Sequence, residues 1–164
     1  MKSLKPALFF LFLIMLFSCN SSNNDYAYNE KVTSIFLQEM KQIDETDSVF
    51  RDTSKVYAKG FPDSIFLSHK ADNLINNSKI DLLDIARLKP SKAAAKFNEG
   101  VTQYLTAIND YGKTAKEMLH VKAIDEKRKY YDLLAVKYEK LNTYPDQLLA
   151  IQKVYLQEVG LQPK

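Results

Sequence analysis

The sequence predicts an all-α fold, an up-down four-helix bundle. Apolar residues recur three and four positions apart along four long segments, as on one face of an α-helix. Runs of alternating β-branched and polar residues, which would indicate strands, are absent from the 164 residues. Amphipathic helices joined by short connections bury their apolar faces by packing side by side, and that arrangement is a bundle.

The first bundle helix is predicted from Tyr28 to about Tyr57. Its apolar face is interrupted by Asp47 and Ser54, at positions that should face inward. We expect the helix to end before Gly60-Phe61-Pro62, because glycine and proline both disfavour helix continuation.

The second helix is predicted to begin at Asp63 or Ser64, since either side chain can cap the free amides of a first turn. Lys89-Pro90 should end it, because the residue before proline disfavours helical dihedral angles. Asn76-Asn77-Ser78 is a weak point within the helix, where a local break remains open.

The third helix has the clearest pattern and can be capped by Ser91. Its apolar residues alternate spacings of four and three: Phe97, Val101, Tyr104, Ile108, Tyr111, Ala115 and Met118. Gly100 and Gly112 lie off that face, where each costs up to about 1 kcal/mol relative to alanine without breaking the helix.

The fourth segment has the same periodicity on both sides of Pro145. The apolar positions are Tyr131, Leu134, Tyr138 and Leu141, and then Leu148, Ile151, Tyr155 and Val159. Thr143 can cap a new helix with the proline in its first turn, so we expect this helix to be kinked or split at Pro145.

The N-terminus has the layout of a secretory signal: basic Lys2 and Lys5, an apolar run from Ala7 to Phe17, and the small residue Ser18. As a helix the apolar run would reach about 16 Å, at 1.5 Å per residue. That is about half the hydrocarbon thickness of a bilayer. We therefore predict a signal peptide over residues 1–18 rather than a membrane span.

Leu16-Phe17-Ser18-Cys19 resembles the lipobox of bacterial lipoproteins, in which the cysteine is diacylated and becomes the mature N-terminus. Cys19 is the only cysteine and has no disulfide partner within the chain. Asn20-Ser21-Ser22-Asn23-Asn24 is polar and typical of an irregular tether. We predict a lipid attachment at Cys19, a tether over residues 19–26 and a bundle domain over residues 27–164. The alternative is an ordinary secreted protein with a cysteine at this position.

This lipid anchor would attach the protein to a membrane of the bacterial cell envelope, with the outer membrane or cell surface favoured over the inner membrane. The formal charge of +3 falls when Lys2 and Lys5 leave with the signal, so the mature chain is nearly neutral. Lys127-Arg128-Lys129 is a short run of the kind that solvates a helix face, and nucleic-acid binding needs larger clusters. We predict no nucleic-acid partner.

Sequence motifs for metal binding or catalysis are weak in this chain. Glu117-Met118-Leu119-His120 has the Glu-x-x-His spacing of di-iron bundles, but such sites need the motif twice and two further glutamates. The other histidine, His69, follows Phe66 by three positions and not a glutamate. No serine lies in the glycine-flanked elbow of a hydrolase. We predict no catalytic residue, no metal site and no cofactor.

The chain has ten tyrosines, and several lie on the predicted helical faces. Tyr104, Tyr111, Tyr131 and Tyr138 are candidates for a ligand or partner surface. The competing interpretation is that they pack in the core and direct their hydroxyls to protein partners. Hydroxyls without a protein partner would favour a polar ligand or a partner helix.

A few features are spread over nearly the whole chain: the lipobox cysteine, Leu88-Lys89-Pro90, Tyr104, Tyr111 and Gln152-Lys153-Val154-Tyr155. In these features the chain is similar to a family of uncharacterised helical surface lipoproteins of bacterial envelopes. The resemblance implies location and fold, and no reaction.

Two functions are expected. A non-enzymatic envelope protein that contacts another protein or the cell exterior through a helix face should expose an apolar or aromatic patch of several hundred Å². A bundle that holds a small hydrophobic or aromatic ligand should have a tyrosine-lined pocket of a few hundred Å³.

Overall fold

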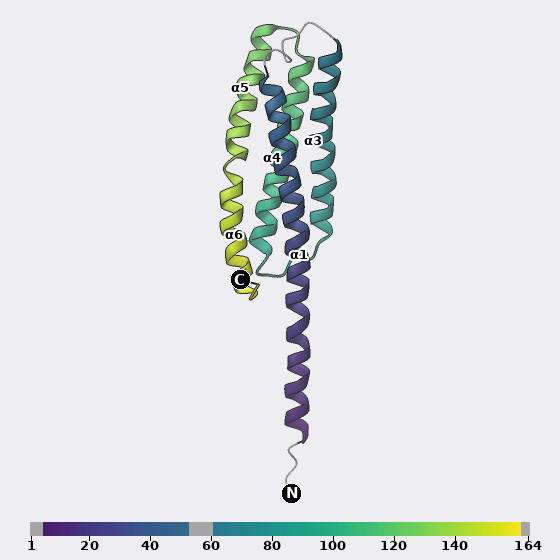
Figure 1. The fold of residues 1–164 in the computed structure, drawn as a ribbon, viewed down its shortest axis with the longest axis vertical. Coiled ribbons are helices and arrows are strands. Elements are labelled where there is room, and N and C mark those ends of the chain that lie inside the picture. Colours follow the sequence, from purple (N-terminus) through teal and green to yellow (C-terminus); the bar gives the residue numbers. More distant parts are fainter. Residues whose placement is uncertain (1–4, 53–60, 162–164) are drawn as a thin grey trace.

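The computed structural model describes the backbone of residues 5–52 and 61–161, and the side chains of residues 24–52 and 64–161. Within those ranges every regular element is a helix: α1 (Lys5–Arg51), α3 (Phe61–Arg87), α4 (Ala95–His120), α5 (Ile124–Leu141) and α6 (Tyr144–Glu158). Figure 1 shows α1, α3 and α4 as three columns of alternating direction, with α5 and α6 end to end as the fourth. The predicted all-α, up-down bundle is confirmed.

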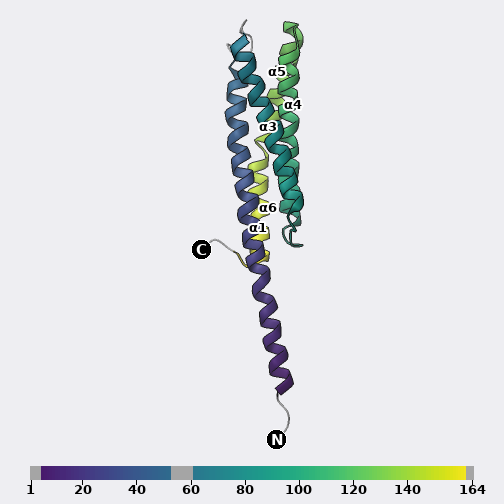
Figure 2. The ribbon, with the colours of Figure 1, turned by 90° about the vertical axis from the view of Figure 1, so that its right-hand side faces the viewer.

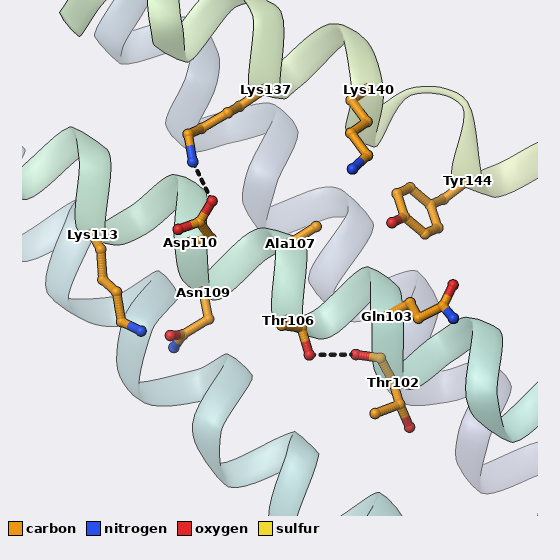
Figure 3. Close-up of a pocket in the computed structure, with 10 residues that line it drawn as sticks. All are labelled: Thr102, Gln103, Thr106, Ala107, Asn109, Asp110, Lys113, Lys137, Lys140 and Tyr144. Carbon is orange, nitrogen blue, oxygen red and sulfur yellow. Dashed lines mark hydrogen bonds and ion pairs between the residues drawn. The ribbon is translucent and has the colours of Figure 1, made fainter.

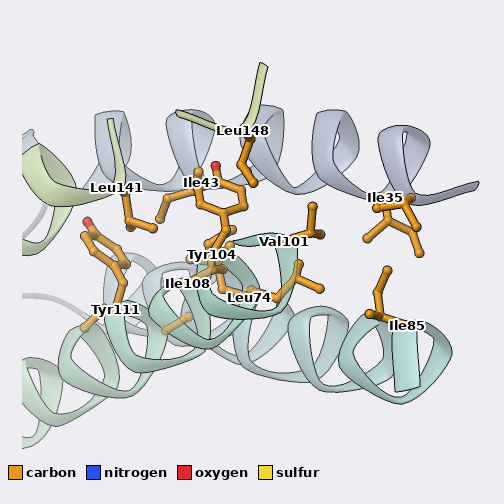
Figure 4. Packing of buried hydrophobic residues seen from close by; sticks show 14 of the residues in the cluster. Ile35, Ile43, Leu74, Ile85, Val101, Tyr104, Ile108, Tyr111, Leu141 and Leu148 are labelled. Atoms are coloured by element: carbon orange, nitrogen blue, oxygen red, sulfur yellow. The ribbon is translucent and has the colours of Figure 1, made fainter. Parts of the chain in front are cut away.

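Helix α4 is the central element and contacts α1, α3, α5 and α6. Its buried residues cover more than one face, because neighbours lie on several sides. Figure 4 shows how Tyr104 and Ile108 of α4 meet Ile43 of α1, Leu74 of α3 and Leu148 of α6. The wide apolar face of α4 therefore packs against all the other helices in the core.

Helix α3 runs unbroken through Asn76-Asn77-Ser78. Ser78 is buried, and its hydroxyl donates to the carbonyl oxygen of Leu74 at 2.6 Å. Asn109 of α4 donates its side-chain amide to the carbonyl oxygen of Ile75 at 2.9 Å and to the Ser78 hydroxyl at 3.0 Å. These bonds satisfy polar groups that would otherwise favour a break.

The fourth column is split into two helices, as expected near Pro145. Helix α5 ends at Leu141, and α6 begins at Tyr144 with Pro145 in its first turn, where a missing amide costs no helical bond. The predicted cap is wrong in detail. Thr143 occupies the cap position without a capping bond, and its hydroxyl donates to the carbonyl oxygen of Lys140 at 2.8 Å.

The predicted cap of α4 differs in a similar way. Ala94 occupies the cap position of this helix and has no capping side chain. The Ser91 hydroxyl accepts a bond from the Ala94 amide at 3.3 Å, one turn before the helix begins, and donates to the Asp25 carboxylate at 2.7 Å. Ser91 therefore stabilises the turn that precedes α4 and links this turn to α1 by a hydrogen bond.

The N-terminal part of α1 leaves the bundle at one end (Figures 1 and 2). Residues 20–24, expected to be irregular, continue this helix, because extending a helix that is already packed avoids the cost of nucleation. Asp25, placed in the tether by the sequence pattern, is buried, and its carbonyl oxygen accepts a bond from Tyr155 at 2.8 Å. Bundle contacts thus begin at Asp25 among the described side chains.

No helix within the described residues has both the length and the hydropathy that a bilayer crossing requires. The predicted inward position Ser54 and the predicted helix end at Gly60 lie outside the described residues.

Gly112 allows α3 and α4 to approach closely. It is buried, although the sequence pattern placed it off the apolar face. A Cβ atom there would lie 2.9 Å from Cγ1 of Ile75 and 3.3 Å from the backbone oxygen of Ala71. At Gly100 the obstruction is Cδ2 of Leu148 at 2.6 Å, the end of a flexible side chain.

We expect Gly112→Ala to lower the free energy of unfolding by about 1–3 kcal/mol, as overpacking against backbone does. Gly100→Ala should cost less, because Leu148 can turn away and the helix gains up to about 1 kcal/mol of propensity. Urea unfolding followed by circular dichroism measures both values. Equal stability of the two variants would contradict this account of the α3–α4 contact.

Candidate functional site

Three of the four candidate tyrosines lie around the ion pair of the buried Asp47 with the exposed Arg51, toward the end of the bundle where α1 finishes. Asp47 and Arg51 come from α1, Tyr111 from α4, and Tyr131 and Tyr138 from α5. We call these five residues the Asp47 cluster. The helical spacing of four places Asp47 and Arg51 on the same side of α1.

Asp47 faces inward, as the sequence predicted, and is 3% exposed. The Tyr111 hydroxyl donates to one carboxylate oxygen at 2.9 Å, and Arg51 pairs with the other. Burial raises the pKa of Asp47, while the Tyr111 hydrogen bond and the Arg51 charge oppose that change. Both oxygens therefore have protein partners, as a buried carboxylate requires.

The α5 tyrosines complete the cluster. The Arg51 guanidinium carbon lies 4.6 Å from the centre of the Tyr138 ring, which is cation–π geometry. The Tyr138 hydroxyl donates to Asp44 at 2.9 Å, and the Tyr131 hydroxyl donates to the Arg51 carbonyl oxygen at 3.3 Å. The hydroxyls of this cluster all have protein partners, which favours the packing interpretation of these tyrosines.

Burial and the neighbouring Asp47 charge raise the pKa of Tyr111, which is 0% exposed. Its phenol is therefore a neutral hydrogen-bond donor at any ordinary pH. The Tyr111 hydroxyl therefore holds the Asp47 carboxylate as a hydrogen-bond donor.

Tyr104 lies apart from the cluster as a core residue, 1% exposed. Its ring packs against Phe36 at 5.1 Å and Tyr144 at 5.4 Å between centroids. Because Tyr104 and Tyr111 are both buried, the four candidates do not form one open surface, and only Tyr131 and Tyr138 are partly exposed.

A cavity of about 250 Å³ opens beside the Asp47 cluster. Its lining combines the ion pair with aromatic and apolar side chains: Asp47, Phe50, Arg51, Tyr111, Tyr131, Leu134 and Ala135. Arg51 and Phe50 were not predicted as site residues from the sequence pattern. The available signals were the four-residue spacing from Asp47 to Arg51 and the place of Phe50 on the apolar face of α1.

A second buried carboxyl group lies between α1 and α3 and was also missed. Glu39 is 0% exposed, and its carboxyl group interacts with the Asp81 carboxyl group of α3, with no cation beside it among the described residues. Burial, and then the charge of Asp81, raise the pKa of Glu39 to about 8. The signal was its position, four residues after Ile35 and four before Ile43 on the inward face.

The remaining sequence candidates do not converge. Glu117 and His120 are both exposed at the end of α4, and His69 is exposed on α3. The Ser68 hydroxyl points to the Asp72 carboxylate at 3.5 Å. No group of three or more His, Cys, Asp or Glu residues that could hold a metal occurs among the described residues. Cys19 lies in the helical backbone of α1, where its side chain is not described.

The Glu39 carboxyl should make stability depend on pH. The folded protein binds this proton with a pKa of about 8, against an ordinary value of 4.5, so between these values it holds more protons than the unfolded chain. The free energy of unfolding should therefore fall as the pH rises from about 5 to about 8. The expected loss is a few kcal/mol, since one pKa unit corresponds to about 1.4 kcal/mol.

Glu39→Gln removes this titration and keeps the shape of the side chain, so its stability should change much less over the same range. Glu30→Gln, on the exposed face of α1, is the matched control and should keep the wild-type slope. Denaturant unfolding at several pH values measures the slopes. Indistinguishable slopes for the wild type and Glu39→Gln would exclude Glu39 as the cause.

Comparison of the whole chain with known proteins found no matching family model, no matching curated protein and no matching solved structure. The resemblance to helical envelope lipoproteins, based on Cys19 and the spaced tyrosines, therefore stays a prediction. The function has to be argued from the residues and geometry of this chain.

Proposed function

We propose that this chain is a lipid-anchored protein of the bacterial cell envelope, whose helical bundle is a non-enzymatic interaction module. The observation that carries the proposal is Leu16-Phe17-Ser18-Cys19, directly after a basic start and a short apolar run. Cys19 is the only cysteine, so lipid attachment has no competing disulfide within the chain. The outer membrane or the cell surface is the favoured location.

The architecture is compatible with removal of the signal. The N-terminal part of α1 projects from one end of the bundle (Figure 2), and the described bundle contacts begin at Asp25. Cleavage before Cys19 would leave those contacts intact. Two acyl chains on one residue give stable membrane attachment, where one chain binds only marginally. From Cys19 to Asp25, a helix would rise about 9 Å, which keeps that end of the bundle near the bilayer.

Two apolar pairs on outer helix faces support an interaction role. Ile80 and Leu83 lie one turn apart on α3, and Leu133 and Val136 lie one turn apart on α5. All four side chains are exposed. Exposed apolar neighbours are the kind of surface that protein partners cover. These two faces are where the module would contact an envelope partner.

The cavity beside the Asp47 cluster favours a second candidate function, the binding of a small hydrophobic or aromatic molecule. Its volume of about 250 Å³ is just below the usual range for ligand sites, which suits a small molecule, and two tyrosines line it. Phe50, Leu134 and Ala135 would contact an apolar body, and the Asp47–Arg51 pair would orient a polar end.

The anchor is tested by Cys19→Ser in a bacterial host. The wild-type protein should stay in the membrane fraction after a high-salt wash and enter solution with detergent. The variant should be found in the soluble fraction, because hydroxyl cannot replace thiol in the thioether link. Ser22→Ala is the matched control and should behave as the wild type. Membrane attachment of Cys19→Ser equal to that of the wild type, or a mature mass without acyl chains, would refute the proposal.

The second candidate is tested by filling the cavity. Native mass spectrometry of protein purified from its membrane should detect a bound small molecule, and Ala135→Phe should reduce its occupancy at least about tenfold by occupying the same space. Ala123→Phe, in the exposed link before α5, should retain the molecule. Wild-type protein without any bound molecule would exclude ligand binding as the function of this cavity.

A further inference from the structure

A larger hollow lies on the other side of α5, between α4 and the junction of α5 with α6. Its volume is about 690 Å³, and it does not share a residue with the cavity beside the Asp47 cluster. Three lysines line it: Lys113 from α4, and Lys137 and Lys140 from α5 (Figure 3). Asp110 is the only carboxylate in its lining. We call this hollow the lysine groove.

The lysine groove has an excess of two positive charges over negative ones. Lys137 forms an ion pair with Asp110, and its side chain is 24% exposed. Lys113 and Lys140 have no ion-pair partner among the residues that the structure describes. Lysines on a single helix face ordinarily serve solubility. Here they come from two helices and line one hollow, with Lys113 toward one end and Lys140 beside Tyr144 toward the other (Figure 3). Like charges along one concave surface raise the local concentration of anions.

Tyr144 adds a fixed hydroxyl group to the same groove. Its ring packs against the buried Tyr104, with 5.4 Å between the ring centres. Figure 3 shows the Tyr144 hydroxyl and the Lys140 ammonium group on the same side, near Ala107 of α4. The small Ala107 side chain leaves the space between them open. A donor already held in place by packing binds a ligand with a smaller loss of entropy.

We propose that the lysine groove binds the phosphate group of a small polar molecule. Lysine binds phosphate as a point charge, whereas planar carboxylates are matched best by the paired donors of arginine, and no arginine lines the groove. The hollow is larger than a phosphate, so it has room for an attached polyol or sugar. Lys140 and the Tyr144 hydroxyl contact the phosphate, and Lys137 stays with Asp110. Lys113, at the other end of the groove (Figure 3), adds to the positive potential that attracts the anion. This site does not depend on the lipid anchor.

The test uses the full chain, purified in a neutral detergent, and isothermal titration calorimetry at low salt. The probe is glycerol phosphate, with glycerol as its uncharged counterpart. The wild type should bind glycerol phosphate with a Kd below about 1 mM and should not bind glycerol. Lys113→Gln together with Lys140→Gln should weaken binding at least about tenfold, and Tyr144→Phe about threefold.

The matched control is Lys122→Gln together with Lys129→Gln, which removes the same charge from exposed positions outside the groove. This pair should keep the wild-type affinity. An equal loss of affinity for glycerol phosphate in both double variants would show that binding depends only on the overall charge. That result would overturn the proposal. Absence of wild-type binding to both soluble glycerol phosphate and phosphatidylglycerol vesicles, or equal binding of glycerol, would also overturn it.

Two sources of the phosphate are separated by a second measurement. Vesicles of phosphatidylglycerol and of phosphatidylcholine are compared with soluble glycerol phosphate, for the wild type and for the groove variant. Binding of soluble glycerol phosphate that the groove variant loses supports a free phosphorylated ligand. Binding of phosphatidylglycerol vesicles alone, lost in the same variant, supports a lipid headgroup in the same groove.

Discussion

The packing of α4 against several neighbours is the constraint on which the rest of the structure depends. A helix covered on one side needs a single apolar face, but α4 buries residues toward α3 and also toward α1, α5 and α6. The packing is tightest at Gly112, because α3 and α4 approach too closely there for a Cβ atom. Cavities and steric overlap both destabilise a close-packed core. The positions of the other helices are therefore set by their packing against α4.

Buried polar bonds then fix how the helices align along their length. Asn109 joins α4 to α3, Tyr111 joins α4 to Asp47 of α1, and Tyr155 joins α6 to Asp25 of α1. Apolar contacts tolerate sliding by a turn, whereas each of these bonds is lost when the register changes. Glu39 differs from these groups, because its buried carboxyl interacts with the Asp81 carboxyl and not with a neutral donor or a cation. Its raised pKa is the physical consequence: the carboxyl keeps its proton and avoids a buried charge.

Local periodicity was sufficient to predict the bundle, the inward position of Asp47 and the split near Pro145, because each depends on neighbours in sequence. Periodicity was insufficient to predict the candidate site. The site depends on which helices pack together and on their relative positions along the bundle axis. Tyr104 and Tyr111 share one face of α4, yet Tyr104 packs with Tyr144 while Tyr111 bonds to Asp47. The lysine groove was missed for the same reason: Lys113 and Lys140 are far apart in sequence and line one hollow only because α4 pairs with α5.

The continuity of α1 has a consequence for the two cavities. If Cys19 carries the proposed anchor, α1 continues from the bilayer into the core, and bonds from Ser91 and Tyr155 hold it at Asp25. At 1.5 Å per residue, Asp47 is about 42 Å along the helix from Cys19. The lysine groove lies part of the way along the bundle, because Asp110 is near the middle of α4. Headgroups near Cys19 would reach neither cavity while α1 stands upright. A soluble phosphorylated molecule is therefore the more consistent occupant of the lysine groove, and a headgroup would require the bundle to lie along the membrane.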